Sequence, residues 1–147
     1  MTRLELLSDE MHLALPREHE LAGRARLRLE DLAGEAWVQT SRESACSRHV
    51  VRLCHAAGFE PRVSFESDDY LTVQGLVAAG VGVALIPQLA LSFTREDIVV
   101  RPLSPSPPRR EVIAAVPAGA RLVPAAPAML GILEEAARRL NTPGRPA

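Results

Sequence analysis

The stretch PRVSFESDDYLTVQGLVAAGVGVALIP, residues 61–87, decides the fold because it predicts a strand, a helix and a second strand in succession. Residues 61–66 alternate apolar and polar side chains, which is typical of a half-buried strand. Residues 69–79 carry apolar side chains at helical spacing and end at Gly80, a common helix terminator. The uninterrupted apolar run at residues 81–87 indicates a strand that is covered on both faces.

The same pattern continues outward from this stretch in both directions. Short apolar runs alternate with amphipathic segments over residues 13–110, which favours an α/β fold with βαβ units and a mostly parallel sheet. Trp37 and Phe65 alternate with polar neighbours, so we expect both rings in the core. A helix near the C-terminus should bury the face that carries Met129 and Leu133. We expect strands at residues 12–16, 36–40, 98–103 and 111–117, helices at 44–57 and 124–140, and helical turns at 29–34 and 88–93.

The composition is that of an ordinary folded domain. Of the 147 residues, 47% are hydrophobic and 24% are charged, and a net charge of −1 indicates no nucleic-acid partner. This length predicts one globular unit, which can have two lobes. Acidic residues interrupt the first 16 positions, where a signal peptide needs an apolar stretch, and no segment reaches the ~18 apolar residues of a membrane span. We therefore expect a cytoplasmic protein without a membrane partner.

The sequence carries none of the common enzyme or metal signatures. It has no phosphate-binding loop, no GxSxG motif and no carboxylate pair at a spacing suited to acid–base catalysis. His19, His49 and His55 do not share a metal-ligand spacing. Cys46 and Cys54 would lie about 12 Å apart along one predicted helix, beyond disulfide reach, which predicts free thiols. We expect no enzyme activity, no cofactor and no metal site.

Three segments together resemble a known family. They are PREHELAGRARLRLEDLAGEAWVQT (residues 16–40), CHAAGFEPRVSFESDDYLTVQGLVAAGVGVALIP (54–87) and VRPLSPSPPRREVIAAV (100–116). No single piece is diagnostic, but their order and spacing resemble the C-terminal effector-binding domain of LysR-type transcriptional regulators. Glu20 departs from the proline that commonly follows the histidine in this family. This is a substitution in a loop and leaves the resemblance intact.

The resemblance implies a fold like that of type 2 periplasmic binding proteins, in which two α/β lobes joined by two crossing strands hold a small ligand between them. Mapped onto this sequence, residues 16–110 would form the complete second lobe. Residues 1–15 and 111–140 would supply the hinge strands and part of the first lobe, and residues 141–147 a disordered tail. The helix-turn-helix, the linker helix and the rest of the first lobe have no counterpart in these 147 residues.

The ends of two predicted strands carry the candidate binding residues. In open α/β sheets a ligand binds beyond the carboxyl ends of strands, where amides at helix starts can meet an anion. The run of residues 39–44 supplies hydroxyls, the side-chain amide of Gln39 and the first free amides of a helix, which together would suit a carboxylate. The carboxylates of residues 66–68 could orient Arg42 or select a ligand donor. A small residue at the next strand would let the backbone approach a ligand. The candidate effector-binding residues are Thr40, Ser41, Arg42, Ser44, Glu66, Ser67, Asp68 and Gly82.

Plain structural roles are open for the same residues. Ser44, and either Ser67 or Asp68, have the side chains of ordinary helix N-caps. Gly80 and Gly82 are of the type that occupies turns without touching a ligand. The sequence alone therefore leaves the choice between capping and binding open.

The resemblance implies a small-molecule sensor in transcription regulation that makes no direct DNA contact through these residues, and the strand-end hydroxyls indicate a carboxylate-bearing metabolite as its ligand. Homo-oligomers, or association with related regulators, are the expected partners. One alternative is an interaction module that pairs with full-length regulators through the uncovered part of the first lobe. Another is a fragment without an independent role. The identity of the effector, and the choice between activator and repressor, stay open at this point.

Overall fold

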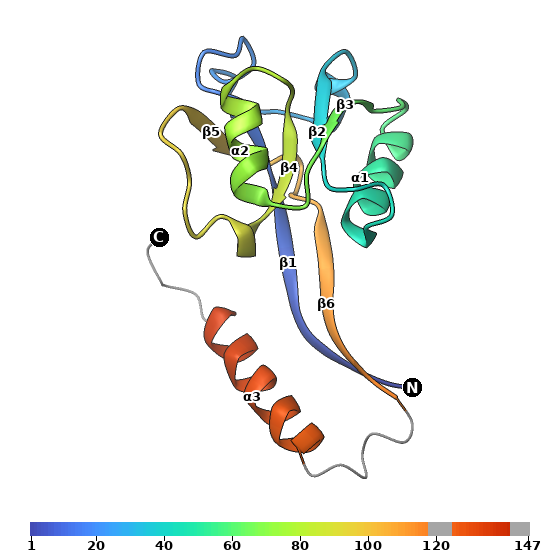
Figure 1. Ribbon diagram of the computed structural model, residues 1–147. Coiled ribbons are helices and arrows are strands. Elements are labelled where there is room, and N and C mark those ends of the chain that lie inside the picture. Colours follow the sequence, from blue (N-terminus) through green and yellow to red (C-terminus); the bar gives the residue numbers. More distant parts are fainter. Residues whose placement is uncertain (118–124, 142–147) are drawn as a thin grey trace. The chain divides into compact units, whose positions relative to one another are not determined.

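The structure, a computed structural model, describes residues 1–117 and 125–141. These divide into two compact units, one formed by Glu10–Arg110 and the other by Met1–Asp9 together with the described residues from Glu111 onward. We call them the large unit and the small unit. Two long strands, β1 (Thr2–Pro16) and β6 (Arg109–Val116), each contribute to both units and pair with each other (Figure 1).

The remaining elements of the large unit follow the predicted order. Each predicted strand, helix and helical turn is confirmed within a few residues, whereas β1 begins ten residues before the expected strand at residue 12. In chain order, the elements are η1 (Leu29–Leu32), β2 (Ala36–Gln39), α1 (Ala45–Ala56), β3 (Arg62–Glu66), α2 (Tyr70–Ala78), β4 (Ala84–Pro87), η2 (Gln88–Ala90) and β5 (Ile98–Arg101).

The main sheet has the strand order β4-β1-β5, with β6 also paired to β1. Strand β1 runs antiparallel to β4, with Leu13 opposite Leu85, and antiparallel to β5, with Leu13 opposite Arg101. Parallel pairing is confined to β2 with β3 and to a bridge between Trp37 and Val83. The expected mostly parallel sheet is therefore wrong. The reason is that a buried apolar strand has the same sequence pattern in either direction once both of its faces are covered.

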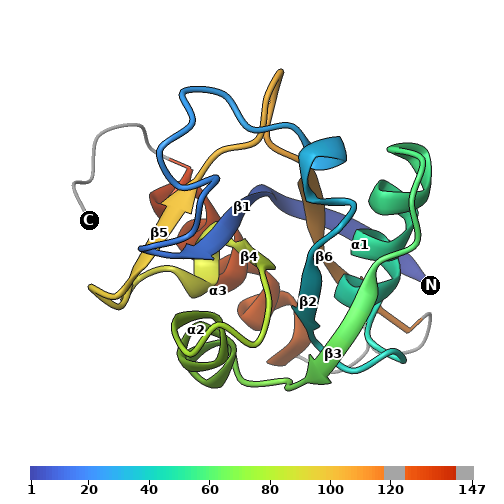
Figure 2. The same cartoon turned by 90° about the horizontal axis from the view of Figure 1, so that it is seen from above.

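Alternate strand residues face two apolar clusters on opposite sides of the strands. The cluster that includes residues of α1 contains Met11, Leu13, Leu15, Trp37, Val50 and Cys54. The cluster that includes residues of α2 contains Ala14, Val38, Val73, Val77 and Ile86. Figure 2 shows α1 and α2 on the two sides of the strands. Because successive side chains of β1 and β2 point to opposite faces, each strand contributes to both the cluster with α1 and the cluster with α2.

The two aromatic rings expected in the core have different environments. Trp37 is 0% exposed and packs against Phe59 with the ring centroids 6.2 Å apart. Phe65 is 50% exposed, so its predicted burial is wrong. In the part of the chain that the structure describes, β3 pairs only with β2 and forms the edge of its two-stranded sheet. A ring on such an edge strand has fewer neighbours to cover it than a ring on β2.

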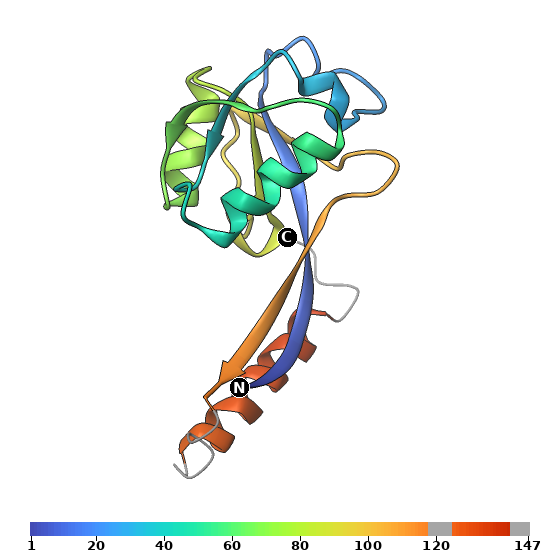
Figure 3. The same cartoon turned by 90° about the vertical axis from the view of Figure 1, so that its right-hand side faces the viewer.

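The small unit contains the start of β1, most of β6 and the helix α3 (Ala125–Leu140). Figure 3 shows β6 running beside β1 in the opposite direction. Within α3 only Ala137 is buried, so the predicted burial of the face with Met129 and Leu133 is not realised. The large apolar side chains of α3 that are exposed are Met129, Ile132, Leu133 and Leu140.

Polar contacts stabilise the C-terminal turns of α3. Glu135 accepts hydrogen bonds from Arg138 at 2.7 Å and from Arg139 at 3.1 Å. The hydrogen bond from Arg139, with the charge of Arg138, lowers the pKa of Glu135. The disordered tail predicted for residues 141–147 lies outside the described residues, apart from Asn141. Among the residues described, no helix is both long and apolar enough to cross a membrane.

Candidate functional site

The loops that follow β2 and β3 lie side by side and form the candidate site. Parallel pairing sets Gln39 of β2 opposite Glu66 of β3, so both strands end at the same edge. Each loop leads directly into a helix, α1 or α2. The structure therefore brings residues 40–44 together with residues 66–68, as the strand-end argument predicts.

The first loop places two hydroxyl groups at the N-terminus of α1. The hydroxyl oxygens of Thr40 and Ser44 are 2.6 Å apart and hydrogen-bonded. Ser44 is the N-cap of α1, where its hydroxyl oxygen accepts the amide hydrogen of Ser47 at 2.9 Å. Because α1 begins at Ala45, the amides of Ala45 and Cys46 have no intrahelical acceptor. Hydroxyls and amides of this kind are suited to an anionic group.

The second loop holds the first in place through its carboxylates. Asp68 accepts the amide hydrogen of Ser41 at 2.9 Å. Glu66 accepts hydrogen bonds from the backbone amide of Arg42 at 3.2 Å and from its Nε at 2.9 Å. The Arg42 side chain is 84% exposed, so Glu66 orients it without removing it from water. Of the two carboxylates, Glu66 contacts Arg42 and Asp68 contacts only the Ser41 backbone, and a role of either in selecting a ligand donor stays a prediction.

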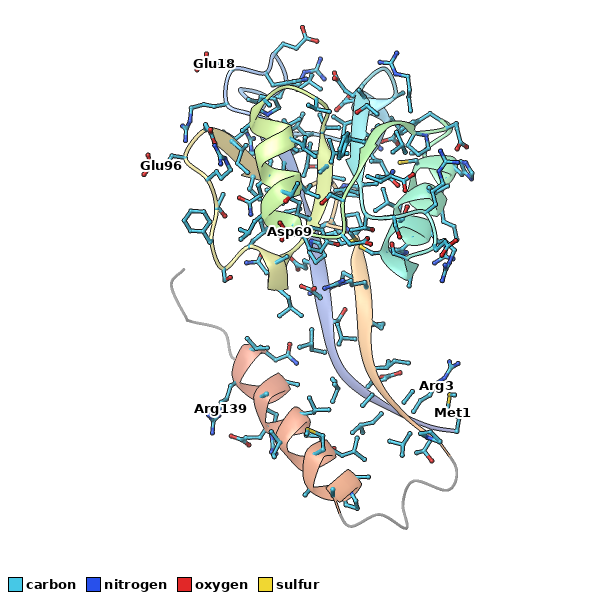
Figure 4. All side chains as sticks on the ribbon, viewed as in Figure 1. Met1, Arg3, Glu18, Asp69, Glu96 and Arg139 are labelled. Atoms are coloured by element: carbon cyan, nitrogen blue, oxygen red, sulfur yellow. The ribbon has the colours of Figure 1, made fainter. Side chains whose placement is uncertain are left out.

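Asp69, rather than Ser67 or Asp68, is the N-cap of α2 (Figure 4). Its carboxylate accepts hydrogen bonds from the amide of Leu71 at 3.3 Å, the amide of Thr72 at 2.9 Å and the Thr72 hydroxyl at 2.6 Å. The predicted cap was therefore placed one or two residues too early. The helix signals of a Ser-Asp-Asp run do not distinguish these positions, because all three side chains are good caps.

Replacing Asp69 by alanine should lower the stability of the protein in a pH-dependent way. The hydrogen bonds from the Thr72 hydroxyl and amide hold the pKa of Asp69 below its ordinary value. A carboxyl group with a lowered pKa stabilises the fold above its unfolded-state pKa, and this contribution is lost as the pH falls through the folded-state pKa. Thermal unfolding of both proteins from pH 7 to pH 2 measures the effect. A difference in melting temperature that does not shrink toward low pH would contradict it.

Gly82 makes a close backbone approach, but to a neighbouring strand. A Cβ atom on Gly82 would lie 2.6 Å from the carbonyl oxygen of Ala36 in β2. The next residue, Val83, donates its amide hydrogen to that oxygen at 2.8 Å. Packing against β2 therefore accounts for glycine at this position. Gly80 has a φ of +77° and is a turn glycine, which agrees with the turn role that the sequence leaves open for it.

Four buried or half-buried residues next to the candidate site carry no motif in the sequence. Gln39, Cys46, Ser47 and Tyr70 line, together with Thr40, a cavity of about 10 Å³ behind the first loop. The Cys46 sulfur lies 3.1 Å from the Tyr70 hydroxyl oxygen. The sequence marks Gln39 through its place at the end of β2, where its side-chain amide is expected to suit a carboxylate. Nothing in the sequence pattern marks Cys46, Ser47 or Tyr70 in this way.

Both cysteines are free thiols, as the helical spacing predicts, and they differ in burial: Cys54 is buried and Cys46 is half-buried. Burial, with the charge of Glu60 as a smaller cause, raises the pKa of the Cys54 thiol to about 12. A thiol with this pKa is protonated and unreactive near neutral pH. Over residues 1–117 and 125–141, no group of three potential metal ligands is present.

Comparison with known proteins identifies related sequences and structures. The family model of the LysR substrate binding domain matches residues 1–138. The HTH-type transcriptional regulator AlsR of Bacillus subtilis (strain 168) is 32% identical over 91 residues, which is 60% of this chain and 30% of AlsR. The chain thus spans less than a third of the length of that curated relative.

Solved structures with a similar fold include two ligand complexes. The CcmR regulatory domain of Synechocystis PCC6803, in complex with 2-PG, superposes with a TM-score of 0.83 at 22% identity and covers 97% of this chain and 69% of that domain. The effector binding domain of QuiR, in complex with shikimate, gives a TM-score of 0.79 at 17% identity and covers 94% of this chain and 66% of that domain. At these identities the likeness shows a common fold.

Proposed function

The chain belongs to the LysR substrate-binding domain family, and from this premise we propose that it senses a small carboxylate-bearing metabolite through the loops that follow β2 and β3. Domains of this family are the effector-binding parts of transcriptional regulators and are not enzymes. The complexes of CcmR with 2-PG and of QuiR with shikimate support a metabolite as the ligand class.

The observation that carries the proposal is the hydroxyl pair at the start of α1. Thr40 and Ser44, 2.6 Å apart, stand beside the free first-turn amides of Ala45 and Cys46. A carboxylate placed there would accept hydrogen bonds from hydroxyls and amides together, and the helix dipole would favour its charge. Arg42, oriented by Glu66, supplies a positive charge at the rim of the same loop.

Replacing Thr40 by valine should weaken carboxylate binding about tenfold, because it removes one hydroxyl hydrogen bond to a charged group without changing the side-chain shape. Isothermal titration calorimetry of the full chain with a panel of small carboxylates measures the change. Thr94→Val, at an exposed loop position, is the matched control and should bind as the wild type does. Unchanged affinity of Thr40→Val for every acid that the wild type binds would contradict the proposed site.

The division into lobes forms part of the proposal. Residues 16–110 would act as the complete second lobe, which carries the candidate site. Residues 1–15 and 111–140 would supply the hinge strands and part of the first lobe. Strands β1 and β6 belong to both compact units, which supports their role as hinge strands. In a whole regulator, ligand binding at this site would bias the arrangement of DNA-binding domains elsewhere in the protein.

A second candidate function, an interaction module, is favoured by the exposed apolar side chains of the small unit. Ile132 is 64% exposed and Met129 is 56% exposed on α3, and Ile113 of β6 is 42% exposed. Apolar surface of this kind is suited to association with a copy of the chain or with a related regulator. Size-exclusion chromatography with light scattering tests this function, and a monomer at micromolar concentration would exclude self-association.

A further inference from the structure

One buried amide behind the candidate site is only half satisfied. The Gln39 side chain is 6% exposed, and its Oε1 accepts a hydrogen bond from the Ser47 hydroxyl at 2.9 Å. Its Nε2 is buried and finds no acceptor among the described residues. Leaving a buried donor unpaired costs about 1–3 kcal/mol, so such groups are rare in folded proteins and mark places where a partner is missing.

The other buried glutamine of the large unit shows how this fold satisfies a structural amide. Gln74 is 0% exposed. Its Nε2 donates to the Phe93 carbonyl at 2.9 Å, and its Oε1 accepts the Arg95 amide hydrogen at 3.0 Å. Gln74 therefore holds the loop before β5 with both ends of its amide. Among the described residues Gln39 pairs only through its oxygen, and its NH₂ group is available to a ligand.

A continuous chain of hydrogen bonds connects Gln39 to the proposed carboxylate site. The Thr40 and Ser44 hydroxyls are 2.6 Å apart, and the Ser44 hydroxyl oxygen accepts the Ser47 amide hydrogen at 2.9 Å. The Ser47 hydroxyl then donates to Gln39. Along this chain Ser44 is half-buried, while Thr40, Ser47 and Gln39 are buried. The polar groups thus lead inward from Ser44 to the buried amide of Gln39.

The cavity at this floor has the size and the lining for one small polar group. Its volume is about 10 Å³, close to the space that a single water molecule requires. Gln39 offers a donor, and the hydroxyl oxygens of Ser47 and Tyr70 on the lining can accept a hydrogen bond. Val50 and Val73 make part of the wall apolar, which disfavours a second charged group there. A hydroxyl group, which both donates and accepts, fits these conditions.

We propose that Gln39 determines the effector class: its Nε2 donates to a hydroxyl group that the ligand carries beside its carboxylate, so that the domain selects hydroxycarboxylates over their deoxy analogues. This inference rests on the proposed function, since it concerns the same site. A site that hydrogen-bonds a ligand hydroxyl discriminates against the analogue that lacks it, because the buried protein group is then left unpaired.

Three pairs of acids that differ by a single hydroxyl group, titrated calorimetrically into the full chain, test the selection. They are glycolate with acetate, lactate with propionate, and malate with succinate. In at least one pair the hydroxy acid should bind the wild type about tenfold more tightly, the effect of one hydrogen bond. Gln39→Met, which keeps the length of the side chain and removes the donor, should reduce this preference to about twofold or less, mainly by weakening the hydroxy acid.

Gln74→Met is the matched control, because Gln74 is a second buried glutamine. This variant should lower the stability of the protein and leave the tenfold preference for the hydroxy acid unchanged. If Gln39→Met does not fold, the double variant Gln39→Met with Ser47→Ala removes both hydrogen-bond partners and avoids an unpaired hydroxyl. A preference that survives in the Gln39 variant, or wild-type affinities that are equal within each pair, would overturn the inference and leave the proposed function standing. Failure of every acid to bind the wild type would overturn both.

Discussion

Replacing Gly82 by alanine is expected to destabilise the large unit by about 3 kcal/mol, the upper part of the range for overpacking a core. The new Cβ would lie 2.6 Å from the Ala36 carbonyl oxygen, 2.9 Å from the Ala36 carbonyl carbon and 3.0 Å from the Trp37 carbonyl carbon. All three are backbone atoms of β2, so no side-chain rotation relieves the clash. The strand must move, and the hydrogen bond from Val83 to Ala36 would be strained with it.

Urea unfolding followed by far-ultraviolet circular dichroism measures this effect. Gly75→Ala is the matched control, because nothing lies within 4 Å of the Cβ it would add and Gly75 is inside α2. In a helix interior alanine is more stable than glycine by roughly 0.5–1 kcal/mol, so this variant should be more stable than the wild type. Two alanine substitutions seven residues apart should thus have opposite signs. A Gly82→Ala protein with wild-type stability would contradict the close approach of Gly82, just before β4, to β2.

Replacing Trp37 by alanine should lower the free energy of unfolding by about 3–5 kcal/mol, the range found for deleting a large buried aromatic side chain. Trp37 is 0% exposed, and its ring is the largest side chain in the cluster that packs beneath α1. The substitution would leave a cavity where the indole ring packs against Phe59, whose ring centroid lies 6.2 Å from that of Trp37. Val38, its neighbour in the chain, faces the other cluster and cannot fill the space.

The same unfolding experiment, with two further variants, separates burial from aromatic character. Trp37→Phe leaves a ring in place and removes an indole N–H that is buried without an acceptor among the described residues, so its cost should be clearly smaller. Phe65→Ala removes a ring that is 50% exposed and should also cost less than Trp37→Ala. Equal losses at positions 37 and 65 would show that β3 is covered in solution in a way that the structure does not describe.

The elements of this fold were predictable because hydrophobic spacing is a local property. The periodicity around Val73 and Val77 predicts α2, and the apolar run that ends at Pro87 predicts β4; the structure confirms both elements. Strand direction was not predictable in the same way. Residues 12–16 pair antiparallel to β4 and β5, and nothing in their sequence distinguishes this from a parallel arrangement.

For the candidate site as well, the position of the loops was predictable, whereas the individual hydrogen-bond partners were not. The general rule that ligands meet strand ends predicts the meeting of residues 40–44 with residues 66–68, and hydrogen bonds between the two loops confirm that meeting. The individual partners were not predictable. Asp69 caps α2 in place of its neighbours, and Gln39 points its amide at Ser47, because both choices depend on distances between segments that the sequence pattern does not contain.

The sequence by itself determined the family, the order of strands and helices and the loops that carry the candidate site, since composition, periodicity and turn residues act over a few positions at a time. Only the tertiary structure decided the antiparallel course of β1, the exposure of Phe65 and the burial of the Gln39 Nε2 without an acceptor among the described residues. These properties arise where segments far apart in the chain meet. At such places burial and hydrogen-bond partners depend on which backbone arrives from elsewhere in the fold.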